Sequence, residues 1–282
     1  MNQTDELIKI LKNALHEDIG EGDHTTLASI PAHAEGKATL LVKNEGILSG
    51  VEVIKTLYNL FDPALKIKVL ITDGQKIRKG DIVYTVSGPA ASILQTERLA
   101  LNIMQRMSGI ATQTSLYVEK IAGTKAKVID TRKTTPGIRL LEKMAVVTGG
   151  GQNHRMGLFD MILLKDNHID YAGSIENAII STHQYLKKNQ KHLPIEIEVR
   201  NFGELEQVLA IGGINRIMLD NFTIENTRKA VDIIAGRYET ESSGGITLDN
   251  ISDYARCGVD YISVGALTHQ IKSLDMSLKA II

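Results

Sequence analysis

Six short apolar runs, each ending in polar or glycine residues, most constrain what this chain can fold into. Their polar ends fall at Asp130, Lys165, Glu198, Asp220, Ser243 and Gly265. Most successive runs are separated by enough residues for a helix, and strands that alternate with helices form a parallel sheet. A charged or small residue at the C-terminal end of each successive strand is typical of an α/β barrel, in which those ends meet at the face that carries the active site. Because six strands are fewer than eight, we expect an incomplete α/β barrel of about six parallel strands.

The chain begins with a different pattern, which predicts an α+β arrangement. Residues 4–16 place apolar side chains at helical spacing, with Thr4 as the expected N-cap. Residues 36–88 consist of short apolar runs divided by glycines, and the turn at Asp73-Gly74 indicates antiparallel strands and hairpins.

Helical periodicity returns in residues 92–121, with an interruption expected near Ser108-Gly109. We divide the chain into an N-terminal α+β domain, residues 1–111, and a barrel domain, residues 112–270. The remaining residues, 271–282, are predicted to form a helix that packs on the first domain.

Charge and cysteine content exclude several classes of protein. The 32 Lys and Arg residues against 33 Asp and Glu residues give a net charge of −1, whereas nonspecific nucleic-acid binding needs a broad basic surface. Cys257 is the sole cysteine, so no internal disulfide forms, which suits a reducing compartment. No apolar run approaches the roughly 18 residues of a membrane span, and acidic residues stand where a signal peptide would be basic. We therefore expect a cytoplasmic protein with no membrane or nucleic-acid partner.

Cations are dense between Asp130 and His168, beside a run of three glycines at 149–151. The candidates for anion contact are Arg132, Lys133, Arg139, His154, Arg155 and Lys165. An arginine fork grips a carboxylate at two places, whereas lysine is a point charge suited to phosphate or carboxylate. So dense a set indicates a polyanionic ligand. The alternative is a solvated surface with ordinary ion pairs to nearby carboxylates.

Two further groups stand at predicted strand ends. Glu198 and Asp220 are carboxylates that would converge on the barrel mouth and hold Mg²⁺, or else pair with the cations and only balance charge. Ser243, Gly244 and Gly265 lie at the last two ends, where glycines let backbone N–H groups approach an anion and barrels commonly hold phosphate. The alternative for these glycines is a tight turn between strand and helix.

Ten sequence fragments, spread over nearly the whole chain, together resemble the quinolinate phosphoribosyltransferases. They are EDIGEGDHTT from Glu17, ERLALN from Glu97, SGIAT from Ser108, DTRKTTPG from Asp130, GGGQNHRMGLFD from Gly149, LLKDNHI from Leu163, EIEV from Glu196, LDN from Leu219, SSGGI from Ser242 and VGALTH from Val264. Each fragment alone is weak evidence for this family, but the ten together are highly specific for it.

The resemblance implies a type II phosphoribosyltransferase, with an N-terminal sandwich-like domain and an incomplete α/β barrel, in a dimer or a larger assembly such as a hexamer. The implied reaction joins quinolinate to phosphoribosyl pyrophosphate, giving nicotinate mononucleotide, pyrophosphate and CO₂ in NAD biosynthesis. Mg²⁺ is the implied cofactor.

The resemblance also implies roles for individual residues. Residues expected to bind the two quinolinate carboxylates are Arg132, His154, Arg155 and Lys165. Those expected to face the ribose pyrophosphate and its metal are Lys133, Glu198 and Asp220, with Glu198 and Asp220 as metal ligands. Ser243, Gly244 and Gly265 would hold the 5-phosphate, and Arg98 would enter the neighbouring subunit's site. The groups expected to act in catalysis are Lys133, Lys165, Glu198 and Asp220.

Two alternative functions remain open at this point. A nicotinate phosphoribosyltransferase uses a related barrel, but its monocarboxylate substrate needs fewer cations than this chain offers. A barrel that binds phosphorylated ligands without catalysis, as a sensor or scaffold, could lose any one of Arg98, Lys133, Lys165, Glu198 and Asp220, whereas this chain retains all of them.

Overall fold

The structure is a computed structural model that describes residues 2–281. These residues form two compact units, which we describe separately. The first unit takes the chain up to Ser115, Thr134–Gly150 and the segment from Leu267 onward. The second unit takes Leu116–Lys133 and Gly151–Ala266. The predicted boundary after residue 111 falls within one long helix, and residues 134–150 lie with the first unit.

The first unit is built around an antiparallel sheet, whose strand order within the described residues is β12-β1-β5-β3. Its elements are α1 (Gln3–Ile19), α2 (His24–Ser29), β1 (Glu35–Val42), β2 (Gly46–Ile47), α3 (Val51–Phe61), β3 (Lys66–Val69), β4 (Lys76–Ile77), β5 (Ile82–Pro89), α4 (Ala90–Lys120, which continues into the second unit), α5 (Arg139–Thr148), α11 (Ala266–His269) and β12 (Met276–Ala280). The predicted α+β character of this part of the chain is confirmed.

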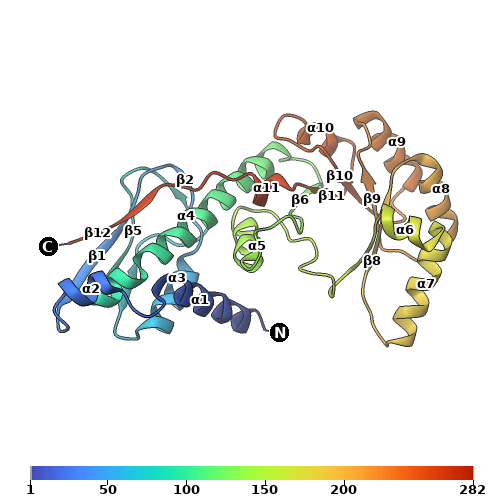
Figure 1. Cartoon of the computed structure of the whole chain (residues 1–282). Coiled ribbons are helices and arrows are strands. Elements are labelled where there is room, and N and C mark those ends of the chain that lie inside the picture. The colour runs from blue at the N-terminus through green and yellow to red at the C-terminus, as the bar shows by residue number, and fades with distance from the viewer. Residues whose placement is uncertain (1, 282) are drawn as a thin grey trace. The chain divides into compact units, whose positions relative to one another are not determined.

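The predicted C-terminal helix is wrong, because this segment contains strand β12. Its residues pair with β1 in antiparallel register, from Ala38 opposite Ala280 to Val42 opposite Met276. The sequence Met276–Ala280, MSLKA, alternates apolar and polar side chains at the period of a strand, and Met276 and Leu278 are buried. Figure 1 shows β12 running beside β1 at the edge of the first unit.

Two local predictions about turns and caps also need correction. The N-cap of α1 is Asn2, whose side chain accepts the N–H of Thr4. Asp73-Gly74 does not close a hairpin, because β3 pairs with β5. The Asp73 carboxylate instead accepts the N–H groups of Val51 and Glu52 and caps α3.

The interruption expected near Ser108-Gly109 is absent from the described helix α4, which is continuous through both residues. Gly109 permits a close backbone contact, since a Cβ there would lie 2.5 Å from the carbonyl oxygen of Lys272. The Ser108 hydroxyl accepts the N–H of Ser49 and donates to its carbonyl oxygen. The small residues therefore serve packing against this helix and do not break it.

The second unit contains the six parallel strands that the sequence predicts, in the order β6-β11-β10-β9-β8-β7 within the described residues. They are β6 (Lys127–Ile129), β7 (Ile162–Leu164), β8 (Ile195–Val199), β9 (Arg216–Asp220), β10 (Glu239–Ser243) and β11 (Tyr261–Ser263). The helices are α6 (Asp166–Ala172), α7 (Ile175–Lys188), α8 (Phe202–Ile211), α9 (Ile224–Ile234) and α10 (Ile251–Arg256). β6 and β7 are the sheet's edges, in keeping with a barrel of six strands rather than eight.

Alternation along the strands separates a packed face from a polar face. Ile197 and Ile217 lie in one buried cluster with side chains of α7, α8 and α9, which cover one side of β8 and β9 (Figure 1). The intervening residues, including Glu198 and Met218, face the other way because successive side chains of a strand point to opposite sides. This second face lines the candidate site.

Among residues 2–281, no helix is long and apolar enough to cross a membrane. Cys257 is a free, buried cysteine.

Candidate active site

A pocket of about 550 Å³ lies at the carboxyl ends of the parallel strands, entirely within the second unit. Its lining residues are Thr131, Arg132, Lys133, His154, Arg155, Leu163, Lys165, Glu198, Met218, Asp220, Asn221, Glu241, Ser243, Gly244, Gly245 and Ser263. The structure thus brings together nine of the eleven site residues predicted from the sequence. Arg98 and Gly265 are the two that do not line this pocket.

Glu198 and Asp220 stand on the neighbouring strands β8 and β9, at the pocket end of the sheet. Glu198 is buried, and burial raises the pKa of its carboxyl, with the charge of Asp220 adding to the shift and Lys165 opposing it. The Asp220 Oδ2 atom accepts a hydrogen bond of 2.6 Å from Asn221 Nδ2. Two carboxylates that destabilise each other beside a cation are a suitable donor set for a divalent ion.

The loop after residue 150 is held in shape by carboxylates. Asp130, at the end of β6, accepts the N–H of His154 at 2.9 Å. Asp160 accepts the N–H groups of Met156 and Gly157 at 2.6 and 2.9 Å. These bonds fix the backbone on both sides of Arg155, so that its position is set before any anion arrives.

Arg155 is the buried cation of the pocket, with 9% of its surface exposed. Its Nη1 donates to the carbonyl oxygen of Met161 at 3.2 Å. Burial lowers the pKa of its guanidinium, and the charge of Arg132 lowers it further. Two guanidinium groups that repel each other in a partly desolvated pocket favour the arrival of an anion.

Lys165, Arg132 and Lys133 are exposed and extend the cationic surface of the pocket. Lys165 occupies the N-cap position of α6, directly after β7, and its N–H donates to His168 Nδ1 at 3.0 Å. The Lys133 N–H donates to Thr131 Oγ1 at 3.0 Å, which orders the turn that follows β6.

Glycines bring the backbone after β10 close to the pocket. Gly244 has φ +92°, and a Cβ there would meet the side chain of Asn221, so a larger residue would collide. Gly245 has φ +63° and open space where its Cβ would project. The turn therefore needs glycine for its conformation and leaves room for a ligand against the backbone. Gly265 lies two residues beyond the end of β11.

Two of the predicted basic residues lie in the first unit. Arg98 is an exposed residue of α4, and Arg139 is the first residue of α5, where its Nε donates to Thr134 Oγ1. Neither lines the pocket of the second unit.

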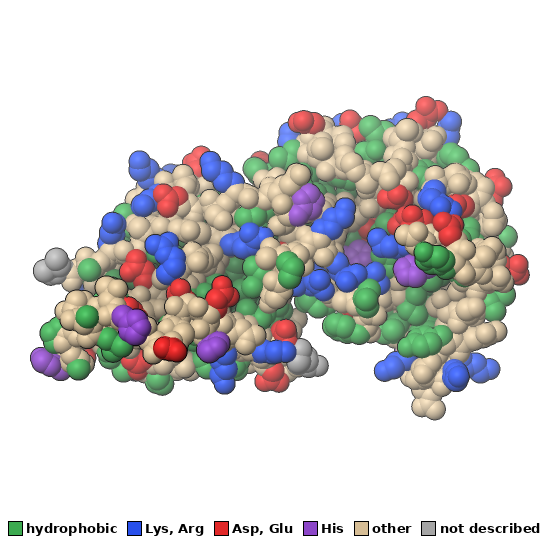
Figure 2. Space-filling model, in the orientation of Figure 1, with side chains coloured by type: hydrophobic (Ala, Val, Ile, Leu, Met, Phe, Trp, Pro, Cys, Tyr) green, Lys and Arg blue, Asp and Glu red, His purple; other side chains and the backbone are tan. Residues whose placement is uncertain are grey.

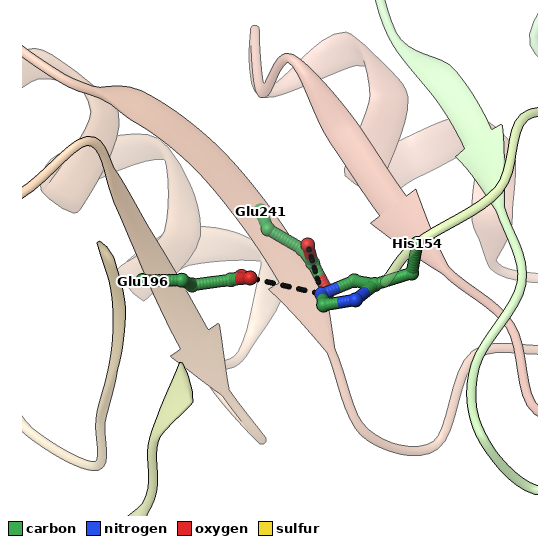
Figure 3. A group of neighbouring side chains, drawn as sticks. All are labelled: His154, Glu196 and Glu241. Atoms are coloured by element: carbon green, nitrogen blue, oxygen red, sulfur yellow. Dashed lines mark ion pairs between the residues drawn. The ribbon is translucent and has the colours of Figure 1, made fainter. Parts of the chain in front are cut away.

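Sequence reasoning missed a buried cluster that His154 forms with Glu196 and Glu241 (Figure 3), of which His154 and Glu241 also line the pocket. His154 Nε2 lies 2.9 Å from Glu196 Oε2 and 3.6 Å from Glu241 Oε2, and both carboxyls are inaccessible to solvent. Burial and the charge of Glu196 raise the pKa of Glu241 to about 8. The sequences IEIEV and ETESS could have indicated this cluster. In each strand two glutamates are two residues apart, so both side chains lie on the same face.

The raised pKa of Glu241 predicts a pH-dependent stability. Between its ordinary value of 4.5 and about 8, the folded chain holds a proton on Glu241 that the unfolded chain has released. The free energy of unfolding should therefore fall as pH rises through this window, by on the order of a few kcal/mol, and level off above it. Urea unfolding at pH 5 and pH 8 measures this change. The free energy of unfolding of Glu241→Gln, relative to that of the parent chain, should increase from pH 5 to pH 8. The same difference for Glu225→Gln, at an exposed position on α9, should not increase. A parent-to-Glu241→Gln difference that is constant over this range would contradict the shift.

Acidic and basic side chains are mixed over much of the visible surface of each unit, as Figure 2 shows. This distribution agrees with the net charge of −1 and with a local, rather than general, concentration of cations.

Comparison with known proteins identifies relatives of both units. Residues 23–108 match the family domain described as quinolinate phosphoribosyl transferase, N-terminal domain, and residues 110–279 match the corresponding C-terminal domain. The chain is 44% identical to quinolinate phosphoribosyltransferase [decarboxylating] 1b of Nicotiana tabacum, over 98% of this chain and 83% of the relative. It is 41% identical to a probable nicotinate-nucleotide pyrophosphorylase [carboxylating] of Bacillus subtilis, over 97% and 93% of the two chains. The crystal structure of NadC from Streptococcus pyogenes superimposes with a TM-score of 0.89 and 41% identity, covering 96% of each chain.

Proposed function

Because this chain belongs to the quinolinate phosphoribosyltransferase family, we propose that its pocket joins quinolinate to phosphoribosyl pyrophosphate with loss of CO₂. The products are nicotinate mononucleotide, pyrophosphate and CO₂, and the reaction supplies NAD biosynthesis. The observation that carries the proposal is that one cavity holds four Lys and Arg residues, a carboxylate pair and a glycine turn. Basic residues suit a dicarboxylate, a carboxylate pair suits a metal-bound pyrophosphate, and a glycine turn suits a phosphate monoester.

The basic residues divide between the two substrates. Arg132, Arg155 and Lys165 are assigned to the quinolinate carboxylates, and His154 borders the same end of the pocket. Lys133 faces the pyrophosphate, where a lysine neutralises charge on the departing group. Ser243 and the Gly244 backbone hold the 5-phosphate, with Gly265 on the neighbouring strand end.

Glu198 and Asp220 offer the hard carboxylate oxygens that suit Mg²⁺. Burial, and then the charge of Asp220, raise the pKa of Glu198, and a bound cation would oppose both effects. Bound there, Mg²⁺ would offset the charge that develops on pyrophosphate. Magnesium ions commonly keep several waters and bind through one or two carboxylates plus substrate phosphates, so this pair is sufficient.

Catalysis then depends on position and electrostatics. The cationic residues hold the ring so that its nitrogen attacks the anomeric carbon as the bond to pyrophosphate breaks. The ring nitrogen becomes cationic on ribosylation, which stabilises the carbanion left when the 2-carboxylate departs as CO₂. A proton then takes its place on the ring. No nucleophilic side chain is needed in this scheme.

An assay of nicotinate mononucleotide and CO₂ with the purified chain tests the proposal. Turnover should require both quinolinate and phosphoribosyl pyrophosphate, and nicotinate should replace quinolinate poorly because a monocarboxylate leaves cations unpaired. Equal turnover of nicotinate would favour the nicotinate phosphoribosyltransferase alternative. Binding of phosphoribosyl pyrophosphate without any turnover would favour the sensor.

We further propose that Arg98 enters the active site of a partner subunit in a two-fold dimer, whether alone or within a hexamer. In support, Arg98 is exposed on α4 and lies in the ERLALN segment, outside the pocket of the second unit. A two-fold axis makes such an exchange reciprocal. A cytoplasmic location remains a prediction.

Mixing two inactive variants tests this exchange. When Arg98→Ala and Lys165→Ala subunits re-associate, each heterodimer should contain one doubly altered site and one intact site. Activity should return to roughly half that of a parent dimer per heterodimer. If native mass spectrometry confirms subunit exchange and activity stays absent, Arg98 does not act in the partner's site.

A further inference from the structure

Both ring nitrogens of His154 face protein groups. Its Nδ1 accepts the N–H of Arg155 at 2.7 Å, so we assign Nδ1 as unprotonated. The proton of the neutral ring is then on Nε2. That nitrogen faces Glu196 Oε2 at 2.9 Å and Glu241 Oε2 at 3.6 Å (Figure 3). His154 therefore links the backbone of Arg155 to the interior of strands β8 and β10.

A metal ion is the competing occupant of this cluster, since the ligand atoms of the three residues lie within 4.8 Å of one another. The surrounding charges argue against it. Arg216 Nη1 lies 3.2 Å from Glu241 Oε2, and the guanidinium of Arg155 also stabilises the Glu196 charge. The two guanidiniums already offset the negative charge of the cluster, and a metal would have to displace the Nε2 proton.

We propose that Glu196 and Glu241 are positioning residues for the quinolinate subsite, acting through His154 on the backbone of Arg155. They anchor the ring, the ring fixes the Arg155 N–H, and the Arg155 guanidinium meets the substrate carboxylate at a defined place. This assignment rests on the proposed function for the identity of the carboxylate. It adds to the place of His154 in the pocket lining, because both ring nitrogens also face protein groups.

Calorimetric titration of quinolinate, with phosphoribosyl pyrophosphate as the reference ligand, tests the linkage. Glu196→Met keeps the length of the side chain and removes the carboxylate that lies 2.9 Å from Nε2. It should weaken quinolinate binding roughly 10-fold and leave phosphoribosyl pyrophosphate binding within about 2-fold. His154→Asn retains an acceptor oxygen near the place of Nδ1 and cannot reach Glu196. It should show a similar loss.

The double variant decides whether the two residues act together. Glu196→Met combined with His154→Asn should bind quinolinate no more weakly than either single variant, because both break one linkage. Glu239→Gln is the matched control. Glu239 lies on the same strand as Glu241 and pairs with the same Arg216, at 3.0 Å, but is not part of the His154 cluster. Its substitution should leave quinolinate affinity unchanged.

Several results would overturn the proposal: wild-type affinity in His154→Asn, additive losses in the double variant, or a parallel loss of affinity for both ligands. Stoichiometric transition metal in the parent chain that is lost in Glu196→Met would assign the cluster to a metal instead.

A readout independent of activity separates this proposal from the proposed function. Nitrogen-15 NMR of the labelled histidines, with His154 assigned from the His154→Asn difference, should show Nδ1 unprotonated and Nε2 protonated. Glu196→Met should change the Nε2 signal. A proton on Nδ1 would refute the linkage even in an active enzyme, whereas the expected tautomer in a chain that does not turn over quinolinate would refute only the function.

Discussion

Lys165→Ala should weaken the free energy of quinolinate binding by about 2 to 5 kcal/mol, which lowers the affinity roughly 30-fold to several thousand-fold. Lys165 stands directly after β7, at the N-cap of a short helix, with its N–H fixed by His168. An ammonium that pairs with a desolvated carboxylate leaves that carboxylate uncompensated when it is removed. The effect should be large in calorimetry of quinolinate and in kcat/KM, since the same cation also offsets the charge on Glu198.

The matched control for this variant is Lys187→Ala, in the last turn of α7 and outside the pocket. It should bind quinolinate as the parent chain does. Heat denaturation should show that both variants remain folded. Unchanged quinolinate affinity in folded Lys165→Ala would remove Lys165 from the substrate site.

Asp220→Asn should lower kcat by about 100-fold or more while changing quinolinate affinity only slightly. The substitution keeps the size of the side chain and an oxygen that can accept the Asn221 N–H bond, which is 2.6 Å in the structure. It removes the charge that would help to hold a cation on the pyrophosphate. Because charge builds on that group during bond breaking, the loss should appear in turnover more than in ground-state binding.

Glu225→Gln, at an exposed ion pair on α9, is the control and should keep full turnover. The parent chain in excess chelator should resemble Asp220→Asn and recover when Mg²⁺ is restored. Full turnover of Asp220→Asn, or of the parent chain in chelator, would contradict the metal role of this pair.

The primary sequence was sufficient to locate the strands of the second unit and most of the pocket. Five of the six strands contain apolar residues and are followed or ended by polar ones, whereas β10, with the sequence ETESS, contains no apolar residue. Parallel strands place all such ends at one edge, and β7, β8 and β9 are neighbours, so Lys165, Glu198 and Asp220 converge on one pocket.

Local signals in the first unit were weaker guides because they allow more than one structure. Gly109 serves as a breaker in some helices, but here it admits the backbone near Lys272 into close contact. Asp73 has the composition of a turn and is used to cap α3, a helix that begins 22 residues earlier in the chain. Residues 276–280 alternate like a strand, but they become one only because the edge of β1 is available to pair.

Tertiary structure alone placed β6 beside β11 and brought Glu196, Glu241 and His154 together from two strands and a loop. Sequence alternation indicates that Glu196 shares a face with Glu198, but it does not indicate which distant loop covers that face. Strand order and the path of residues 151–161 decide this. The Asp130 carboxylate accepts the N–H of His154, which is 24 residues away, and Asp160 accepts the nearby N–H groups of Met156 and Gly157. The residues that line the pocket therefore follow from the pattern of the strands, whereas the buried groups that hold them in place follow from how the loops pack.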